Sequence, residues 1–145
     1  MNKTKFEYQV VLAPAEEGGF VVTCRNHPEV ITQGENEQDV LQQASNAMEE
    51  AFALRIDDSL DFPRPSRRRQ NKVLVSPPAE MVAKAALYVA MREANVTKAD
   101  LAKRLGVDER KVRRLLDPHH GSKLPRIAEA IGTLGMRLRI ELART

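Results

Sequence analysis

The chain has 145 residues, of which 42% are hydrophobic and 30% charged, and its formal net charge is +3. These proportions are those of a globular protein and exclude a disordered chain, and no apolar run approaches the roughly 18 residues of a membrane span. The charge is divided along the chain, with a balance of −7 up to Ser66 and +10 from Arg67 onward. This division predicts two functional parts with two partners, and nucleic acid is the expected partner of the basic part.

The cysteine content and the first residues bear on the cellular compartment. Cys24 is the only cysteine and cannot form an internal disulfide, so the sequence gives no sign of an oxidising compartment. The first residues, Met1–Gln9, contain no apolar run of the signal-peptide kind. We therefore expect a cytoplasmic protein.

The first part of the chain has the pattern of a small α+β unit. Apolar and polar residues alternate from Phe6 to Leu12 and again from Phe20, which is typical of strands, and Pro14–Gly19 between them is rich in turn residues. Asn36 precedes a stretch with helical apolar spacing and is expected to cap it. The predicted elements are strands over Phe6–Ala13, Phe20–Cys24 and Val30–Thr32, a helix over Glu37–Asp57, and a last strand over Lys72–Ser76.

A connector and a domain boundary follow. Asp61–Asn71 contains two prolines and three consecutive arginines, which do not belong in a core, so a linker is predicted there. Pro77–Pro78 marks the boundary between an N-terminal domain, residues 1–78, and a C-terminal domain, residues 79–145. At this boundary the charge balance is −3 for the first domain and +6 for the second, so the asymmetry persists at a smaller size.

Beyond the boundary the pattern is helical and then changes. The predicted helices run over Ala79–Ala94, from a Thr97 cap to about Leu105, from an Asp108 cap to about Leu116, and from about Pro125 to a stop at Gly135. Met136–Ala143 alternates apolar and polar residues as a strand does. A lone strand needs a partner for its backbone groups, either in the first domain's sheet or in the same strand of a second chain. Pairing between chains is favoured, because it makes a two-fold dimer that presents two copies of the basic domain to nucleic acid.

The segment Thr97–Leu116 has the spacing of a helix-turn-helix. Ala102 is small enough for two helices to cross closely, and Gly106 permits the left-handed backbone of a tight turn. The outer side of the second helix is charged and suits a major groove. The alternative interpretation is an ordinary helical hairpin with a solvated charged face.

This segment resembles the helix-turn-helix of the lambda-repressor-like class. The resemblance implies that some of its side chains read bases and that others hold phosphates. The expected base contacts are Glu109, Arg110 and Arg114, and the expected phosphate contacts are Lys98, Lys111 and Arg113. Glu109 has two interpretations, as an acceptor for cytosine N4 or as a charge that favours the helix N-terminus.

The first domain carries a second resemblance. Its sequence Glu17-Gly18-Gly19-Phe20 is followed by Pro28, by Thr32-Gln33-Gly34, and by a helix that enters through Asp39 and Ala44. Joined to a helix-turn-helix, this pattern resembles the HicB family, the antitoxins of HicAB toxin–antitoxin systems, in its branch with a C-terminal helix-turn-helix. The resemblance covers the whole chain.

The resemblance to the HicB family implies a fold, a function and partners. The fold is expected to be α+β, with an N-terminal β-β-β-α-β domain that is partially RNase H-like and an all-α helix-turn-helix domain. The first domain is expected to bind and neutralise HicA, a small basic mRNA-cleaving toxin. The second is expected to repress the protein's own operon as a homodimer or higher even-numbered oligomer on operator DNA. The toxin contacts are unknown, with candidates Glu16, Glu17 and Glu35 on the acidic first domain.

Enzymatic chemistry is not indicated by the sequence. The carboxylates of the first domain lack a spacing that holds two metal ions, and no zinc-ligand spacing or cofactor motif is present, so we expect no metal, no cofactor and no enzyme. His27, beside a proline, is interpreted as structural, and His119–His120 as either a phosphate contact or a plain loop. The rival function is a plain helix-turn-helix transcription factor whose first domain senses a ligand or another protein.

Overall fold

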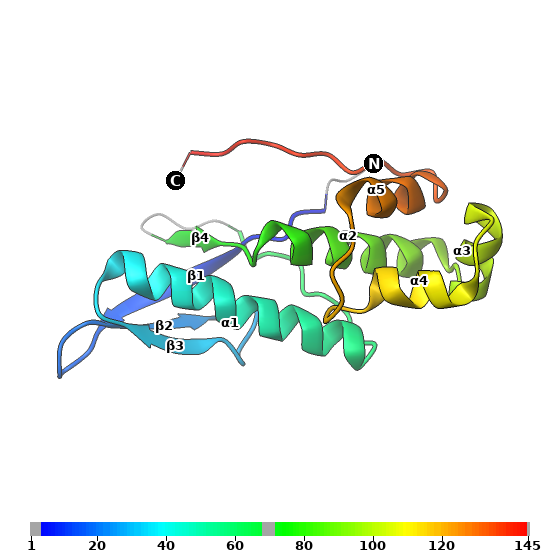
Figure 1. Ribbon diagram of the computed structural model, residues 1–145. Coiled ribbons are helices and arrows are strands. Elements are labelled where there is room, and N and C mark those ends of the chain that lie inside the picture. The colour runs from blue at the N-terminus through cyan, green and yellow to red at the C-terminus, as the bar shows by residue number, and fades with distance from the viewer. Residues whose placement is uncertain (1–3, 68–71, 145) are drawn as a thin grey trace. The chain divides into compact units, whose positions relative to one another are not determined.

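The structure is a computed structural model that describes residues 4–67 and 72–144 (Figure 1). The chain forms two compact units, divided between Val82 and Ala83. This division lies inside helix α2 (Ala79–Ala94), four residues beyond the boundary predicted at Pro78. An antiparallel sheet with one helix is followed by further helices, which confirms the predicted α+β class.

The first unit is built on a four-stranded antiparallel sheet. Its strands are β1 (Tyr8–Pro14), β2 (Phe20–Cys24), β3 (Ile31–Gly34) and β4 (Val73–Val75), in the spatial order β3-β2-β1-β4. Val10 of β1 pairs with Cys24 on one side and with Val73 on the other. Helix α1 (Glu37–Asp57) packs on the sheet, so the predicted β-β-β-α-β order is confirmed.

The core of the first unit lies between the sheet and α1. Strand alternation and helical spacing turn apolar side chains toward each other across this layer. The buried residues include Tyr8, Val10, Val22 and Cys24 from the sheet and Val40, Ala44, Met48 and Phe52 from α1. The Phe52 ring meets Tyr8 and Phe62 edge to face, with centroids 6.0 Å and 4.8 Å apart. Few aromatic residues are present, and the sheet–helix layer gathers most of them.

Two glycines allow the β1–β2 turn, β3 and α1 to approach one another closely. Gly19 has a φ of +74°, and a Cβ on it would collide with the carbonyl oxygen of Gly34. A Cβ on Gly34 would lie within 2.6 Å of the backbone N and Cα of Val40 in α1. Any larger residue at either position would therefore push the turn, the strand and the helix apart. Both glycines belong to the sequence pattern that carries the resemblance of this domain.

Part of the predicted linker packs against the first unit. Side chains of the sheet and of the loop after β2 donate to backbone carbonyls of residues 63–66. These hydrogen bonds run from Tyr8 Oη to Pro63 (2.8 Å), from Gln9 Nε2 to Ser66 (3.0 Å), and from Asn26 Nδ2 to Arg64 (3.2 Å). We call residues 61–67, which form the described part of the predicted linker, the strap of this unit. Residues 68–71, with two of the three consecutive arginines, lie outside the described residues.

The second unit is helical, as predicted. After α2 it contains α3 (Lys98–Leu105), α4 (Glu109–Leu116) and α5 (Leu124–Gly132). One fully buried residue from each helix contributes to its core, namely Leu87, Leu101, Val112 and Ile127. In the part of the chain that the structure describes, no helix is both long and apolar enough to cross a membrane.

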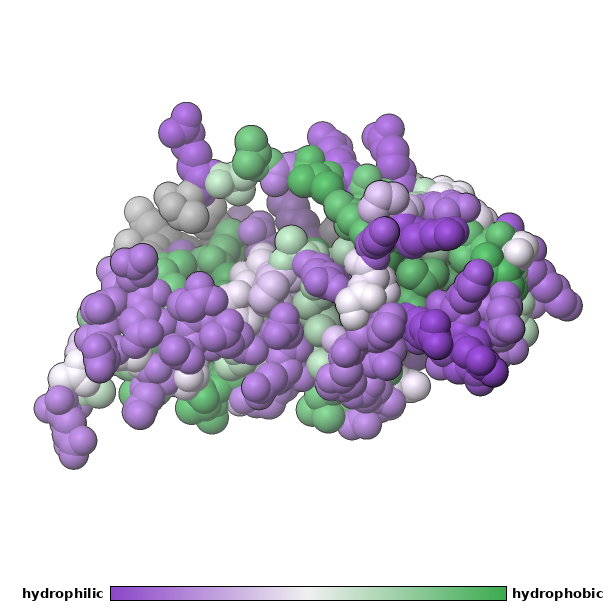
Figure 2. Space-filling model, in the orientation of Figure 1, coloured by the Kyte–Doolittle hydropathy of each residue, from purple (hydrophilic) through white to green (hydrophobic). Residues whose placement is uncertain are grey.

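The C-terminal segment differs from its prediction. The alternation in Met136–Ala143 predicts a strand, yet the structure assigns this segment to no helix or strand. The physical reason is that a strand needs hydrogen bonds to a neighbour, and the described sheet consists of β1 to β4. Ile140 is 74% exposed and Leu142 is fully exposed. Green, apolar side chains accordingly stand out along this segment in Figure 2, where Figure 1 draws it in red.

Candidate nucleic-acid interface and acidic surface

The turn between α3 and α4 is specified on both sides by local hydrogen bonds. At the start of α3, Thr97 Oγ1 accepts from the Asp100 N–H (3.1 Å), and the Asp100 carboxylate accepts from the Thr97 N–H (3.2 Å). These bonds to Thr97 lower the pKa of Asp100 from its usual value. At the end of α3, Gly106 takes a φ of +65°, and the Val107 N–H bonds the Ala102 carbonyl (3.0 Å). Local sequence thus fixes where α4 begins.

Helix α4 separates apolar from charged side chains. Val112 and Leu116 are buried and mark its inner side. At about 100° per residue, Arg114 lies opposite that side and Arg110 lies one turn earlier on nearly the same line. The predicted DNA contacts on α4 are all exposed: Glu109, Arg110, Lys111, Arg113 and Arg114. In Figure 2 the surface over α4 is strongly hydrophilic.

The remaining predicted contacts fall at different positions around this helix. We call the line through Arg110 and Arg114 the outward line of α4. Lys111 and Arg113 lie on either side of it, where phosphate contacts are expected. Glu109 lies in the first turn, where the Asp108 side chain caps the helix by accepting from the Arg110 N–H (2.8 Å). Lys98 is exposed in the first turn of α3.

A depression of about 230 Å³ lies beside α4 within the second unit. Its apolar lining comes from Leu105, Val107 and Leu115, and its polar lining includes His120 and the charged residues Lys111, Arg114, Lys123, Arg126 and Glu129. His120 therefore lies next to two predicted DNA contacts. Sequence reasoning missed Lys123 and Arg126. The available signal was their place at the start of α5, where Lys123 forms no side-chain cap and the backbone N–H groups favour an anion.

The three acidic candidates gather at one end of the sheet of the first unit. Glu16 and Glu17 lie in the turn between β1 and β2, which the Gly18 N–H closes onto the Ala15 carbonyl (3.1 Å). Phe20 pairs with Gly34 in the β2–β3 ladder, and this register brings that turn beside Glu35. All three acidic residues are exposed. We call Glu16, Glu17 and Glu35 the acidic corner.

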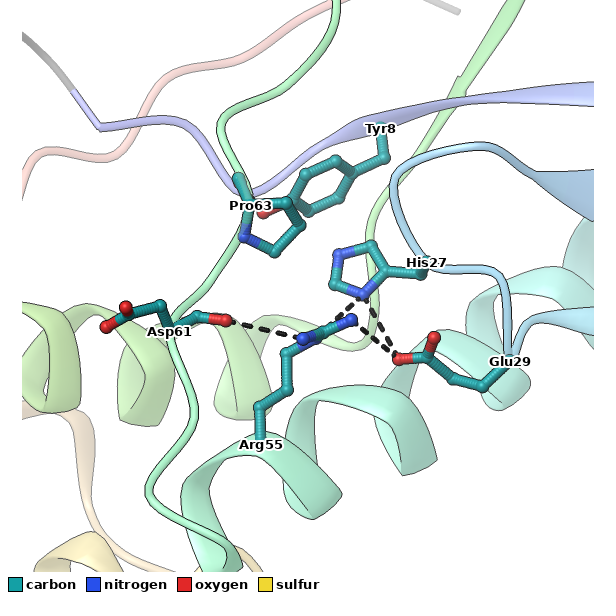
Figure 3. Close-up of polar contacts among 6 residues, drawn as sticks. All are labelled: Tyr8, His27, Glu29, Arg55, Asp61 and Pro63. Atoms are coloured by element: carbon teal, nitrogen blue, oxygen red, sulfur yellow. Dashed lines mark hydrogen bonds and ion pairs between the residues drawn. The ribbon is translucent and has the colours of Figure 1, made fainter.

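The first unit also contains a buried polar cluster around His27 (Figure 3). His27 is completely buried, and its Nδ1 accepts from Arg55 Nε at 3.2 Å. Arg55 also donates to Glu29 Oε1 (3.0 Å) and to the backbone carbonyl of Asp61 (3.3 Å), so it ties α1 to the loop before β3 and to the strap. Among the described residues, no group of three or more His, Cys, Asp or Glu side chains could hold a metal ion.

The hydrogen bond to Nδ1 sets the protonation state of His27. A neutral ring that accepts at Nδ1 carries its proton on Nε2, and this buried nitrogen has no hydrogen-bond partner in the described chain. The edge of the His27 ring points toward Tyr8 in Figure 3. The centroids of the two rings are 4.3 Å apart, and the ring planes meet at 83°. Burial, followed by the charge of Arg55, lowers the pKa of His27 to about 4, although Glu29 opposes the shift. His27 is therefore neutral at pH 7.

Comparison with known proteins decides the family. A family model described as the HicB-like antitoxin of a bacterial toxin-antitoxin system matches residues 7–86. Antitoxin HicB of Escherichia coli (strain K12) is 31% identical over 133 residues, which are 92% of this chain and 96% of that protein. Antitoxin HicB of Pseudomonas fluorescens (strain Pf0-1) is 34% identical over 139 residues, with 94% of each chain covered. Antitoxin HicB 1 of Photorhabdus laumondii is 30% identical over 135 residues, 93% of this chain and 86% of that protein.

This chain belongs to the HicB-like antitoxin family. The resemblance inferred from the sequence is thereby confirmed, and membership in an antitoxin family implies a toxin partner. The match to residues 7–86 spans the whole sheet and α1, including both closely packed glycines and the acidic corner. The similarity to the Escherichia coli protein continues over most of the chain and so extends into the helical unit.

The structure of this HicB-like antitoxin groups some predicted site residues and separates others. Five of the six predicted DNA contacts share α4, and the three acidic candidates share one end of the sheet. The cluster around His27 could not be read from the sequence, because Arg55 is 28 residues away and carries no local signal for this contact. A histidine next to a proline only indicated a structural role.

The His27 cluster predicts a pH dependence of stability. Because the folded-state pKa lies below the ordinary value of 6.5, the unfolded chain binds the proton first, and the first unit loses stability as the pH falls from about 6.5 to about 4. The loss attributable to His27 is about 3 kcal/mol. His27→Gln should remove this part of the pH dependence, whereas His120→Gln at an exposed position should retain it.

Tyrosine fluorescence during urea unfolding gives the measurement. The chain has two tyrosines and no tryptophan, so Tyr88→Phe leaves Tyr8 as the sole reporter of the first unit. Free energies of unfolding at pH 7 and pH 4 are compared in this background. The same pH dependence with and without His27 would contradict the assignment.

Proposed function

We propose that this antitoxin neutralises a HicA-type, mRNA-cleaving toxin through its N-terminal unit and represses its own operon through α4. The single observation that carries the DNA-binding half is the placement of Arg110 and Arg114 on the outward line of a short helix whose inner side is buried. A helix of this kind fits a major groove, where arginines bind guanine edges in pairs of hydrogen bonds. A protein with this target acts where the DNA is, so we place it in the cytoplasm.

The surroundings of α4 support phosphate binding. Lys111 and Arg113 flank the outward line, Lys98 lies at the exposed start of α3, and Lys123 and Arg126 line the adjacent depression. Phosphate contacts set the register of a protein on the duplex, while base contacts provide the sequence preference. Glu109 lies in the first turn of α4, which favours the role of a charge at the helix N-terminus.

The toxin-binding half is supported by the family and by charge. The acidic corner presents three exposed carboxylates at one end of the sheet, where a small basic toxin finds a complementary surface. Complementary charge mainly accelerates association and selects the partner. The protein acts by binding in both halves, and no catalytic step is assigned to it.

The exposed C-terminal segment supports a dimer. Met136–Ala143 alternates apolar and polar residues, and its apolar side is uncovered at Ile140 and Leu142. Pairing with the same segment of a second chain would satisfy its backbone groups and bury these side chains. A two-fold dimer would place two α4 helices on the two halves of a palindromic operator.

Substitution of the outward arginines tests operator recognition. Arg110→Ala and Arg114→Ala should each weaken operator binding by about 1–3 kcal/mol and relax the preference for the contacted base. Arg25→Ala removes the same charge from an exposed position in the other unit and should leave operator binding unchanged. Titrations by fluorescence anisotropy with operator and scrambled DNA give the affinities. Wild-type affinity in both α4 variants would mean that α4 does not enter the groove.

Charge reversal tests the acidic corner. Glu17→Lys with Glu35→Lys should lower the association rate with the toxin of the same operon about tenfold or more at low salt, with a smaller effect at high salt. The control, Glu50→Lys with Asp58→Lys, makes the same charge change on and after α1 and should leave the rate close to wild type. Stopped-flow mixing measures both rates. Equal effects of the two pairs would show that only net charge matters.

Removal of the C-terminal segment tests the dimer. A chain that ends at Gly135 should be a monomer and should lose most of its operator affinity, because each α4 would then bind a half-site alone. Arg137→Glu, on the polar side of the segment, should remain dimeric. Light scattering reports the oligomeric state. A truncated protein that stays dimeric would exclude pairing of this segment.

A further inference from the structure

A buried lysine contacts the end of α4. Lys84 of α2 is 2% exposed. Its Nζ donates to the backbone carbonyls of Arg114 (3.2 Å) and Leu115 (2.9 Å) and to Ser122 Oγ (3.0 Å). Burying an ammonium group is costly unless its hydrogen bonds are satisfied, and these three oxygens match the three N–H donors of the group. The contact therefore joins α2, the last turn of α4 and the loop that leads to α5.

The sequence after α4 leaves these carbonyls open to an outside donor. A continuing helix would bond the Arg114 carbonyl to the N–H of residue 118, but Pro118 has no N–H. The Leu115 carbonyl would bond residue 119, but the His119 N–H donates instead to the Asp117 carboxylate (2.9 Å). Besides the Lys84 ammonium, the Arg114 carbonyl accepts long bonds from the Asp117 N–H (3.3 Å) and from Ser122 Oγ (3.4 Å). A cation at this end also complements the helix dipole.

We propose that Lys84 is a positioning residue for operator recognition. Its ammonium fixes the backbone of Arg114, and the base-reading side chain of our proposed interface departs from that same residue. Through Ser122 it also holds the loop next to Lys123, which lines the depression beside α4. The inference rests on the proposed DNA-binding function of α4 and adds a buried residue to it.

Burial separates this role from that of a phosphate contact. A side chain that is 2% exposed cannot reach the DNA backbone, so its loss should not reduce the number of phosphates that the protein neutralises. Loss of the Lys84 ammonium should instead change the direction in which the Arg114 side chain points. Operator binding is therefore expected to weaken much more than binding to scrambled DNA, with an unchanged salt dependence.

Lys84→Met tests the inference, since it keeps the apolar stem and removes the ammonium. The full-length protein is titrated with operator and with scrambled DNA over a range of salt concentrations. Operator affinity should fall about tenfold or more, while affinity for scrambled DNA and the salt slope stay close to wild type. Lys98→Met, at an exposed predicted phosphate contact, should weaken both DNAs and lower the salt slope by about 1. Wild-type operator affinity in Lys84→Met, or the Lys98→Met pattern, would overturn the proposal.

A second variant covers the case in which Lys84→Met unfolds the unit. Ser122→Ala removes one acceptor and no charge, so it should give a smaller loss with the same preference for operator over scrambled DNA. If Lys84→Met does fold, the double variant Lys84→Met with Ser122→Ala should bind no more weakly than Lys84→Met alone, because both substitutions act through one contact. Fully additive losses would contradict a shared contact.

Hydrogen exchange separates this inference from the proposed function. Without DNA, the amides in the last turn of α4 should exchange faster in Lys84→Met and in Ser122→Ala than in wild type. If wild-type protein fails to distinguish operator from scrambled DNA, the proposed function fails, and this exchange result still decides whether Lys84 holds the helix. Unchanged exchange in both variants would exclude the positioning role.

Discussion

The recognition helix of the proposed repressor depends on how its two ends are closed. Five of the eight residues of α4 are charged, and a helix of this length is unstable in isolation. The Asp108 side chain closes the first turn, burial of Val112 and Leu116 holds the middle, and the Lys84 ammonium closes the last turn. Each of these contacts faces inward or along the axis, so the outward line of Arg110 and Arg114 stays exposed, as the proposed contact with DNA requires. Apolar packing and the two caps therefore orient α4 so that its charged side chains face outward.

The first unit consists of one sheet packed against one helix, and few aromatic residues are available to stabilise this layer. Gly19 and Gly34 let the β1–β2 turn and β3 approach α1, and the same approach assembles the acidic corner at that end of the sheet. Elsewhere, Arg55 joins α1, the loop before β3 and the strap through one guanidinium group. His27 remains neutral beside it because burial and the nearby positive charge both disfavour protonation. The polar cluster thus stabilises a unit whose apolar core is small.

Local signals were sufficient to predict the helices and the four strands of the sheet, and they placed the candidate DNA contacts on exposed positions. Asn36, Thr97 and Asp108 each cap the helix predicted for them, and Gly106 adopts the left-handed conformation that a tight turn needs. Helical periodicity also placed Arg110 and Arg114 on the outer side of α4. These features involve residues within one or two turns of each other, and a sequence carries such information directly.

Contacts between distant segments were not predictable from the sequence. Lys84 reads as one residue of an amphipathic helix, and its three acceptors lie about 30 residues or more away along the chain. The prolines and arginines of residues 61–71 predict a linker, and they do not predict that carbonyls of residues 63–66 accept hydrogen bonds from Tyr8, Gln9 and Asn26. The alternation in Met136–Ala143 predicted a strand whose partner a single chain does not supply. For Lys84 and the strap the deciding neighbour is supplied by tertiary structure, and for the C-terminal segment we propose that a second chain supplies it.

We propose that the two binding activities belong to different units of one chain. Hydrogen exchange of the full-length protein with the toxin alone, and then with operator DNA alone, tests it most directly. We expect the toxin to slow exchange in the turn and strand ends around the acidic corner, and the operator to slow exchange in α4 and at the start of α5. Protection of α4 by the toxin, with none near Glu17 and Glu35, would contradict it.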